Sequence, residues 1–275
     1  MRYAVFICTH GRPNRQSTLQ ALREAGYLGM IFLVLDDEDD TAQGYVKYEN
    51  DHTKILVFNK QEWIDRSETG IPEDIRSTVL YAKNFCEHMA SDIFNLDAYI
   101  LADDDLLKFY YPIADMEIKY CMQDVIYHIV EYLLTCNICM LGFMAKPKSK
   151  YMSILKYVVG EDRLPYHFMV RNCRHRVNWR SFIGQDLIGN LDASIRGRYI
   201  FNIHLVQYTF TPNTSISGGM KSTYELVSDY TRTICIFKYY PSSVEMSECG
   251  DCGFEIAYRR NNMCPMLVSS RYKKG

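Results

Sequence analysis

Residues 98–106 read AYILADDDL, an apolar strand sequence that runs directly into three consecutive aspartates. In open α/β sheets, ligands bind in the crevice at the carboxyl ends of the strands. Alternate side chains of an extended segment point to the same side, so Asp103 and Asp105 are expected to face one cation together. Carboxylate oxygens suit Mg²⁺ or Mn²⁺. The segment therefore predicts a divalent-metal site, with a solvated acidic turn as the alternative.

Strands and helices alternate on both sides of this segment. Near-continuous apolar runs predict buried strands, and apolar residues spaced by three or four predict helices. The alternation predicts an α/β fold with a mostly parallel sheet covered by helices on both faces, followed after residue 150 by a more irregular region. The expected strands are 3–8, 31–35, 54–58, 98–102, 139–144, 200–210 and 234–240, and the expected helices are 15–25, 73–90 and 122–134.

The charge is distributed unevenly along the 275 residues. The net charge is only −2, but residues 1–140 carry 12 Lys/Arg and 23 Asp/Glu, whereas residues 141–275 carry 19 and 10. An acidic half joined to a basic half predicts two binding tasks, a metal in the first and a polyanion in the second. With 48% apolar and 23% charged residues, the composition excludes a disordered or low-complexity chain.

No export or membrane segment is expected. The first residues, MRYAVFICTHGRPN, lack the apolar core and cleavage site of a signal peptide, and no apolar run approaches the roughly 18 residues of a membrane span. A cytoplasmic protein is expected, with its ten cysteines mostly reduced. A zinc site is the alternative for Cys249, Cys252 and Cys264, with Cys235 as a distant fourth ligand.

Three of the first four expected strands end in polar clusters, at residues 9–12, 36–40 and 103–105. This order of elements resembles the GT-A glycosyltransferases. More narrowly, CTHGRP (8–13), YAKNF (81–85) and LADDDL (101–106) resemble the TET-associated glycosyltransferases of bacteriophages, a family thought to glycosylate hydroxymethylated pyrimidines in DNA. The resemblance covers about residues 1–145 well. Lys83 stands where an arginine is expected in that family.

The resemblance implies a GT-A (Rossmann-like) fold in which residues 1–145 form the nucleotide-sugar-binding half. Residues 146–275 would form the acceptor-binding half of the same domain, including the cysteine-containing C-terminal segment. A loop hydrogen bond is the alternative for His10, a surface charge for Arg76 and a core position for His204. The implied donor-binding residues are Thr9, His10, Gly11, Arg12, Asp36, Asp37, Arg76, Lys83, Asp103 and Asp104, and the implied metal ligands are Asp103, Asp105 and His204.

The second half must supply the acceptor site. Asp186 follows the apolar stretch SFIGQ, and the resemblance to inverting GT-A enzymes implies that it is the catalytic base, a role that suits a carboxylate within hydrogen-bond reach of the acceptor hydroxyl. A helix cap or an ion pair is the alternative. Arginines bind phosphates and Trp179 could stack on a base, whereas a solvated basic face is the alternative. The expected acceptor-binding residues are Arg171, Arg174, Arg176, Trp179, Arg180, Gly218 and Gly219.

The resemblance, together with the acidic cluster at residues 103–105, implies a metal-dependent glycosyltransferase. It would use Mn²⁺ or Mg²⁺ and move a sugar from a nucleoside-diphosphate sugar, with a UDP-sugar expected, onto the hydroxymethyl group of 5-hydroxymethylcytosine in phage DNA. Its expected location is the cytoplasm, that of the host if a phage encodes it. A glycosyltransferase acting on a glycan, lipid or protein is one alternative. A nucleotidyltransferase, which also needs paired acids, is another, and a non-catalytic DNA-binding protein with a zinc element is the third.

Overall fold

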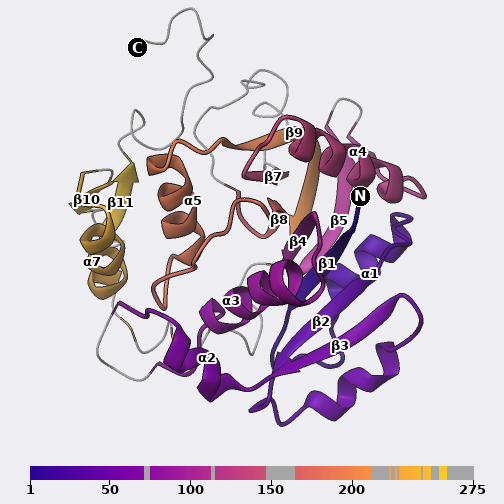
Figure 1. Ribbon diagram of the computed structural model, residues 1–275, viewed down its shortest axis with the longest axis horizontal. Helices are drawn as coiled ribbons and strands as arrows, with labels where there is room; N and C mark the ends of the chain where they lie inside the picture. Colours follow the sequence, from indigo (N-terminus) through magenta and orange to yellow (C-terminus); the bar gives the residue numbers. More distant parts are fainter. Residues whose placement is uncertain are drawn as a thin grey trace, which may run out of the picture.

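The structure is a computed structural model that describes residues 1–70, 75–112, 115–146 and 165–211. Beyond these it describes residues 223, 227, 229–242, 244–248 and 254–258. Within these ranges, a nine-stranded sheet has the order β3-β2-β1-β4-β8-β7-β9-β5-β6 (Figure 1). A separate hairpin pairs β10 (Val244–Glu248) with β11 (Phe254–Tyr258).

One part of the large sheet is parallel and comes entirely from the first half of the chain. Cys8 at the end of the central strand pairs in register with Val34 on one side and with Asp103 on the other. The carboxyl ends of these strands therefore meet at one edge, as predicted for a ligand-binding α/β sheet. The four strands are β1 (Tyr3–Cys8), β2 (Ile31–Asp36), β3 (Thr53–Phe58) and β4 (Ala98–Asp103).

The rest of the sheet is mixed, and it interleaves the two halves of the chain. One strand from the second half, β8, lies between β4 and β7 and is antiparallel to both. A second, β9, is parallel to β7 and antiparallel to β5. The strands of this part are β5 (Leu106–Tyr111), β6 (Met116–Glu117), β7 (Met140–Ala145), β8 (Phe168–Asn172) and β9 (Ile200–Phe210).

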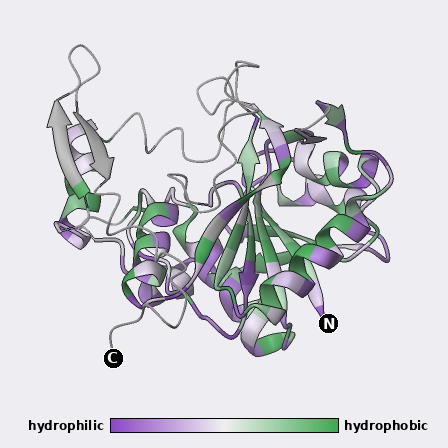
Figure 2. Ribbon diagram, turned by 90° about the horizontal axis from the view of Figure 1, so that it is seen from above, coloured by the Kyte–Doolittle hydropathy of each residue, from purple (hydrophilic) through white to green (hydrophobic). Residues whose placement is uncertain are grey.

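Helices cover both faces of the sheet, as predicted. Side chains of β1 alternate between two cores, because successive residues of a strand point to opposite faces. One core packs α1, α4 and the short η1 against the sheet, and the other packs α2, α3 and α5. Figure 2 shows helices on both sides of the sheet. The helices are α1 (Ser17–Glu24), η1 (Ala42–Tyr48), α2 (Lys60–Arg66), α3 (Leu80–His88), η2 (Met89–Ile93), α4 (Met122–Thr135), α5 (Gln185–Ile195) and α7 (Asp229–Tyr239).

Two sequence-based predictions of secondary structure are wrong. The expected strand 234–240 lies largely in the helix α7, where Cys235 packs against Phe182 and Ile183. A short apolar run does not distinguish a strand from a buried helix. The expected helix 73–90 begins only at Leu80, whose backbone N–H donates to the Oγ1 of the non-helical Thr78 at 3.2 Å. No described helix is both long and apolar enough to cross a bilayer.

Candidate active site

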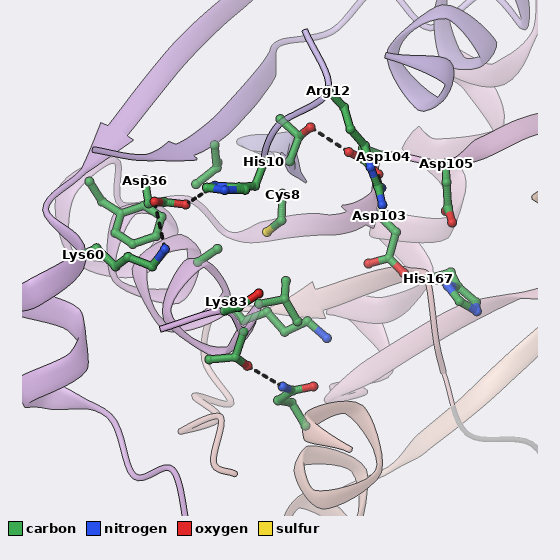
Figure 3. Close-up of a pocket in the computed structure, with 18 of the residues that line it drawn as sticks. Cys8, His10, Arg12, Asp36, Lys60, Lys83, Asp103, Asp104, Asp105 and His167 are labelled. Atoms are coloured by element: carbon green, nitrogen blue, oxygen red, sulfur yellow. Dashed lines mark hydrogen bonds and ion pairs between the residues drawn. The ribbon is translucent and has the colours of Figure 1, made fainter. Parts of the chain in front are cut away.

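A pocket of about 290 Å³ opens at the carboxyl ends of the parallel strands (Figure 3). Its walls come from the loop after β1, the turn after β4, and residues of α2, α3 and α5. In Figure 3, Asp36 and Lys60 lie at one end of the pocket, and Asp105 and His167 lie at the other. Residues from both halves of the chain therefore enclose one cavity, and its two ends carry different chemistry.

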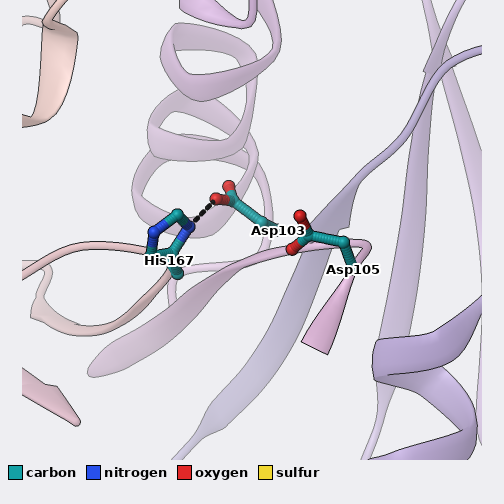
Figure 4. Close-up of side chains that lie close together, drawn as sticks. All are labelled: Asp103, Asp105 and His167. Atoms are coloured by element: carbon teal, nitrogen blue, oxygen red, sulfur yellow. Dashed lines mark hydrogen bonds and ion pairs between the residues drawn. The ribbon is translucent and has the colours of Figure 1, made fainter. Parts of the chain in front are cut away.

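At one end, Asp103, Asp105 and His167 form a cluster whose potential ligand atoms all lie within 4.8 Å of one another (Figure 4). Asp103 ends β4, Asp105 lies in the turn to β5, and His167 immediately precedes β8. The Nδ1 of His167 lies 2.6 Å from Oδ2 of Asp103. The sequence-based prediction that Asp103 and Asp105 share one side is confirmed by this cluster.

The donor set of this cluster fits a divalent cation. The Oδ1 of Asp105 is buried and has no hydrogen-bond partner among the described residues. Burial, together with the charge of Asp103, raises the pKa of Asp105 to about 7. A cation would satisfy the orphaned oxygen and stabilise the ionised carboxylate, and two carboxylates with one imidazole suit Mn²⁺ or Mg²⁺.

Asp104 points to the other side of the same segment and holds the loop after β1. It accepts hydrogen bonds from Thr9 Oγ1 at 2.6 Å and from the guanidinium of Arg12 at 2.5 Å. Gly11, with a φ of +69°, donates its backbone N–H to Asp39. Thr9, Arg12 and Asp104 were predicted to bind the donor. They line the pocket, but their polar groups also bind one another and fix the loop.

At the opposite end of the pocket, a histidine and a lysine hold the carboxylate of Asp36. Asp36 accepts from His10 Nδ1 at 2.7 Å and from Lys60 Nζ at 3.0 Å. Burial alone would raise the pKa of Asp36, but His10 and Lys60 lower it to about 2. The hydrogen bond to Asp36 raises the pKa of His10. His10 and Asp36 therefore line the pocket, where they were predicted to bind the donor. Lys60 also lines it but was not predicted.

Asp37 does not line the pocket. Its carboxylate accepts hydrogen bonds from the side chain of Asn59 at 2.8 Å and from the backbone N–H of Lys60 at 2.9 Å. These contacts hold the first turn of α2, where an anion is favourable. The structure thus gives Asp37 a helix-stabilising contact instead of the predicted donor contact.

Three more predicted residues reach the pocket wall. Arg76 lies there and binds Glu38 and Gln61. The Nζ of Lys83, from α3, lies 2.5 Å from Oδ1 of Asp186 in the first turn of α5. Lys83 also lies over the ring of Trp179, with 5.2 Å between Nζ and the ring centroid. The ion pair that was the alternative for Asp186 is therefore present, and its carboxylate still lines the pocket.

A family model described as TET-Associated Glycosyltransferase matches residues 3–209, well over half of the chain. The chain belongs to this family. Membership confirms the predicted GT-A fold and the predicted glycosyltransferase class. A search of curated proteins finds no match.

Solved structures resemble the chain at the level of the fold. A crystal structure of a mycobacterial protein has a TM-score of 0.52 at 10% identity, covering 94% of this chain and 83% of that one. TarS 1–349 of S. aureus has a TM-score of 0.49 at 13% identity and covers 77% of this chain, which spans 60% of the TarS chain. GalNAc-T7 with UDP, GalNAc and Mn²⁺ has a TM-score of 0.40 at 10% identity, covering 76% of this chain and 44% of that one.

Within this TET-associated glycosyltransferase, the predicted basic acceptor surface does not form as expected. Arg171 and Trp179 are fully buried. Arg171 lies 3.7 Å from Glu87 and donates to the carbonyl of His175, so it satisfies a buried acid within the core. Trp179 packs in the core formed by α3 and α5, and a nucleic-acid base cannot stack on it there.

The other acceptor candidates lie nearer the surface. Arg174 is exposed. Arg176 pairs with Asp92, and Arg180 binds Asp192 and the hydroxyl of Tyr240. Gly218, Gly219 and the proposed zinc ligands Cys249, Cys252 and Cys264 lie outside the described residues, as does the side chain of His204.

Sequence reasoning missed His167 and Lys60. His167 directly precedes the short strand 168–172, which was itself not predicted because its sequence FMVRN ends in polar residues. Lys60 follows the end of the third strand, where the same rule that located the other polar clusters would have found it. Both residues lie next to the end of a strand, and this position is the feature of the sequence by which they could have been found.

Proposed function

We propose that this protein is a metal-dependent glycosyltransferase that moves a sugar from a UDP-sugar to the hydroxymethyl group of 5-hydroxymethylcytosine in DNA. The observation that carries the proposal is the cluster of Asp103, Asp105 and His167 at one end of a pocket in a TET-associated glycosyltransferase. We place the reaction in the cytoplasm, where DNA and nucleotide sugars are both found, and in a host cell if a phage encodes the protein.

The metal end suits the diphosphate of the donor. Asp103, Asp105 and His167 would hold Mn²⁺ or Mg²⁺, and the bound cation would neutralise the charge of the leaving diphosphate. Arg76 also lines the pocket, but it pairs with Glu38, which lies 3.4 Å from Lys60, so its charge belongs to the opposite end. A nucleoside diphosphate is anionic only at its diphosphate end. The cation bound at this end of the pocket would complement that charge.

The opposite end suits the nucleobase. Both oxygens of Asp36 are occupied by His10 and Lys60, so the carboxylate is already satisfied by the protein. His10 and Lys60 carry N–H groups that can donate to a ligand there, and the apolar side chains of Val34 and Phe58 also line the pocket. Donors recognise carbonyl oxygens. Uracil presents a carbonyl where cytosine presents an amino group, which supports uridine as the donor nucleoside.

Asp186 is the proposed base for the acceptor hydroxyl. Its Oδ1 binds Lys83, which orients the carboxylate at the pocket wall and leaves Oδ2 for a second partner. A carboxylate within hydrogen-bond reach can take the proton of the attacking hydroxyl. In this proposal the hydroxymethyl oxygen then attacks the anomeric carbon as UDP departs. A base that reaches such a pocket from a duplex must leave the stack.

Transfer assays with defined DNA test the proposal. Duplexes of equal sequence that contain cytosine, 5-methylcytosine or 5-hydroxymethylcytosine are incubated with Mn²⁺ and a panel of UDP-sugars. We expect a mass increase of one sugar, with release of UDP, only on the hydroxymethylated duplex. Transfer to a glycan but never to DNA would overturn the acceptor, and release of pyrophosphate would indicate a nucleotidyltransferase instead.

A further inference from the structure

Two thiols meet beside the pocket. Cys8 ends β1 and lines the cavity, where Figure 3 shows its sulfur among the labelled side chains. Cys86 lies in α3, and the two Sγ atoms are 3.8 Å apart. Cys8 is 8% exposed and Cys86 is 0% exposed, and neither is in a disulfide. The proposed transfer reaction uses neither thiol.

We propose that Cys8 and Cys86 form an oxidisable dithiol site that a small disulfide, entering through the pocket, converts to an internal disulfide. Cys8 attacks the small disulfide RSSR first, because it faces the cavity, and gives a mixed disulfide with release of RSH. The thiol of Cys86 then attacks the Cys8 sulfur, forms the Cys8–Cys86 bond and releases the second RSH, so two protein thiols are oxidised as one RSSR is reduced.

The packing supports this order of events. Burial and the neighbouring Cys8 raise the pKa of the Cys86 thiol, which disfavours Cys86 as the first nucleophile. Its attack on the mixed disulfide gains from proximity, since the sulfur atoms are already in contact. A disulfide has an S–S length of about 2.05 Å, so the sulfurs must approach by about 1.8 Å.

That approach must affect the donor pocket. Lys83 precedes Cys86 by three residues and lies on the same side of α3. Its Nζ binds Asp186, and Cys8 pairs in register with Asp103. A close-packed interior transmits such a displacement. The oxidised protein should therefore bind UDP more weakly than the reduced protein.

The test is oxidation of the full-length protein with oxidised glutathione, followed by non-reducing peptide mapping. We expect a linked peptide joining Cys8 to Cys86, slower formation when UDP fills the pocket, and about tenfold weaker UDP binding that dithiothreitol restores. In the Cys86→Ala variant, Cys8 should instead retain glutathione. The matched control, Cys136→Ala, removes an exposed thiol and should form the same linked peptide as the wild type.

Two results would overturn the inference. If oxidised glutathione modifies Cys136 fully but no Cys8–Cys86 peptide forms, the dithiol site is wrong. If the linked peptide forms and UDP binding is unchanged, the coupling to the pocket is wrong. The peptide map does not depend on the transfer reaction, so a failure of the proposed glycosyltransferase activity would be distinguishable from a failure of the dithiol site.

Discussion

Asp186 and Lys83 share one short ion pair, yet their burial differs. Oδ1 and Nζ are 2.5 Å apart, but the Lys83 side chain is 2% exposed and that of Asp186 is 23% exposed. Removing Asp186 leaves a buried ammonium, whereas removing Lys83 leaves a carboxylate that water can reach. We expect Asp186→Asn to cost about 3 kcal/mol of unfolding free energy and Lys83→Met about 1 kcal/mol.

Urea unfolding of both variants measures this asymmetry. The double variant Lys83→Met with Asp186→Asn should be more stable than Asp186→Asn alone, since it no longer buries an unpaired charge. Equal costs for the two single variants would show that burial does not set the energetics of this pair.

Asp105→Asn should separate metal binding from stability. Residues that only orient a metal ligand are worth roughly 10- to 100-fold in metal affinity, so loss of a direct ligand should weaken Mn²⁺ binding by about 100-fold or more. The folded-state pKa of Asp105, about 7, lies above its ordinary 3.8. The contribution of Asp105 to the stability of the metal-free protein is therefore lost as the pH rises from 3.8 to about 7, and this loss is complete at pH 8, where the variant should melt at a higher temperature.

Calorimetric titration with Mn²⁺ and thermal melts at pH 8 without metal give the two readouts. Asp40→Asn, at an exposed position, is the matched control and should change neither. Unaltered Mn²⁺ affinity in Asp105→Asn would contradict the assignment of this residue as a ligand.

Asp36 should make stability depend on acid pH. Its folded-state pKa of about 2 lies below the ordinary 3.8, so its contribution of about 2 kcal/mol is complete above pH 4 and is lost as the pH falls towards 2. The difference in unfolding free energy between the wild type and Asp36→Asn should accordingly shrink between pH 5 and pH 3. A difference that stays constant over this range would exclude the His10–Asp36–Lys60 arrangement.

Lys60→Met should alter base selectivity. The variant removes a donor from the proposed nucleobase end but leaves the metal cluster intact, so UDP binding should weaken by about tenfold while CDP binding changes less. Calorimetric titrations with both nucleotides measure the ratio. Lys54→Met changes an exposed lysine of β3 and serves as the control. Equal losses for UDP and CDP would argue against a role for Lys60 in reading the base.

Trp179→Ala should act on stability and leave DNA contacts unchanged. A fully buried tryptophan contributes about 3–5 kcal/mol relative to alanine. Well below the lowered melting temperature, the variant should bind DNA as the wild type does. Binding isotherms at several salt concentrations test this. The same isotherms test the exposed Arg174: Arg174→Gln should reduce the salt dependence of DNA binding if Arg174 contacts a phosphate.

Much of the fold is predictable from local sequence because the parallel strands are continuous apolar runs. The strand 168–172 is not, since its Arg171 and Asn172 resemble a polar loop. Arg171 lies near Glu87, and Asn172 donates to the carbonyl of Ile138. These partners of the buried polar side chains lie far away in the sequence, so the periodicity of the strand does not reveal them.

The candidate site also contains residues that local sequence predicts and contacts that only the tertiary fold creates. Asp103 and Asp105 follow from alternation within one strand, a local rule. The contact between His167 and Asp103 joins residues 64 positions apart and depends on the insertion of β8 beside β4. The burial of Trp179 is similarly tertiary, because it requires α3 and α5 to pack together. Local charge density therefore overestimates the accessible basic surface.

The position of β8 also constrains how the chain can be divided. Because β8 fills the space between β4 and β7, a fragment ending near residue 145 would leave one side of β4 with unpaired backbone groups. An exposed apolar strand edge promotes intermolecular pairing. The two halves of the chain are thus expected to be interdependent for solubility, and co-expression of both fragments would be needed to recover a folded protein.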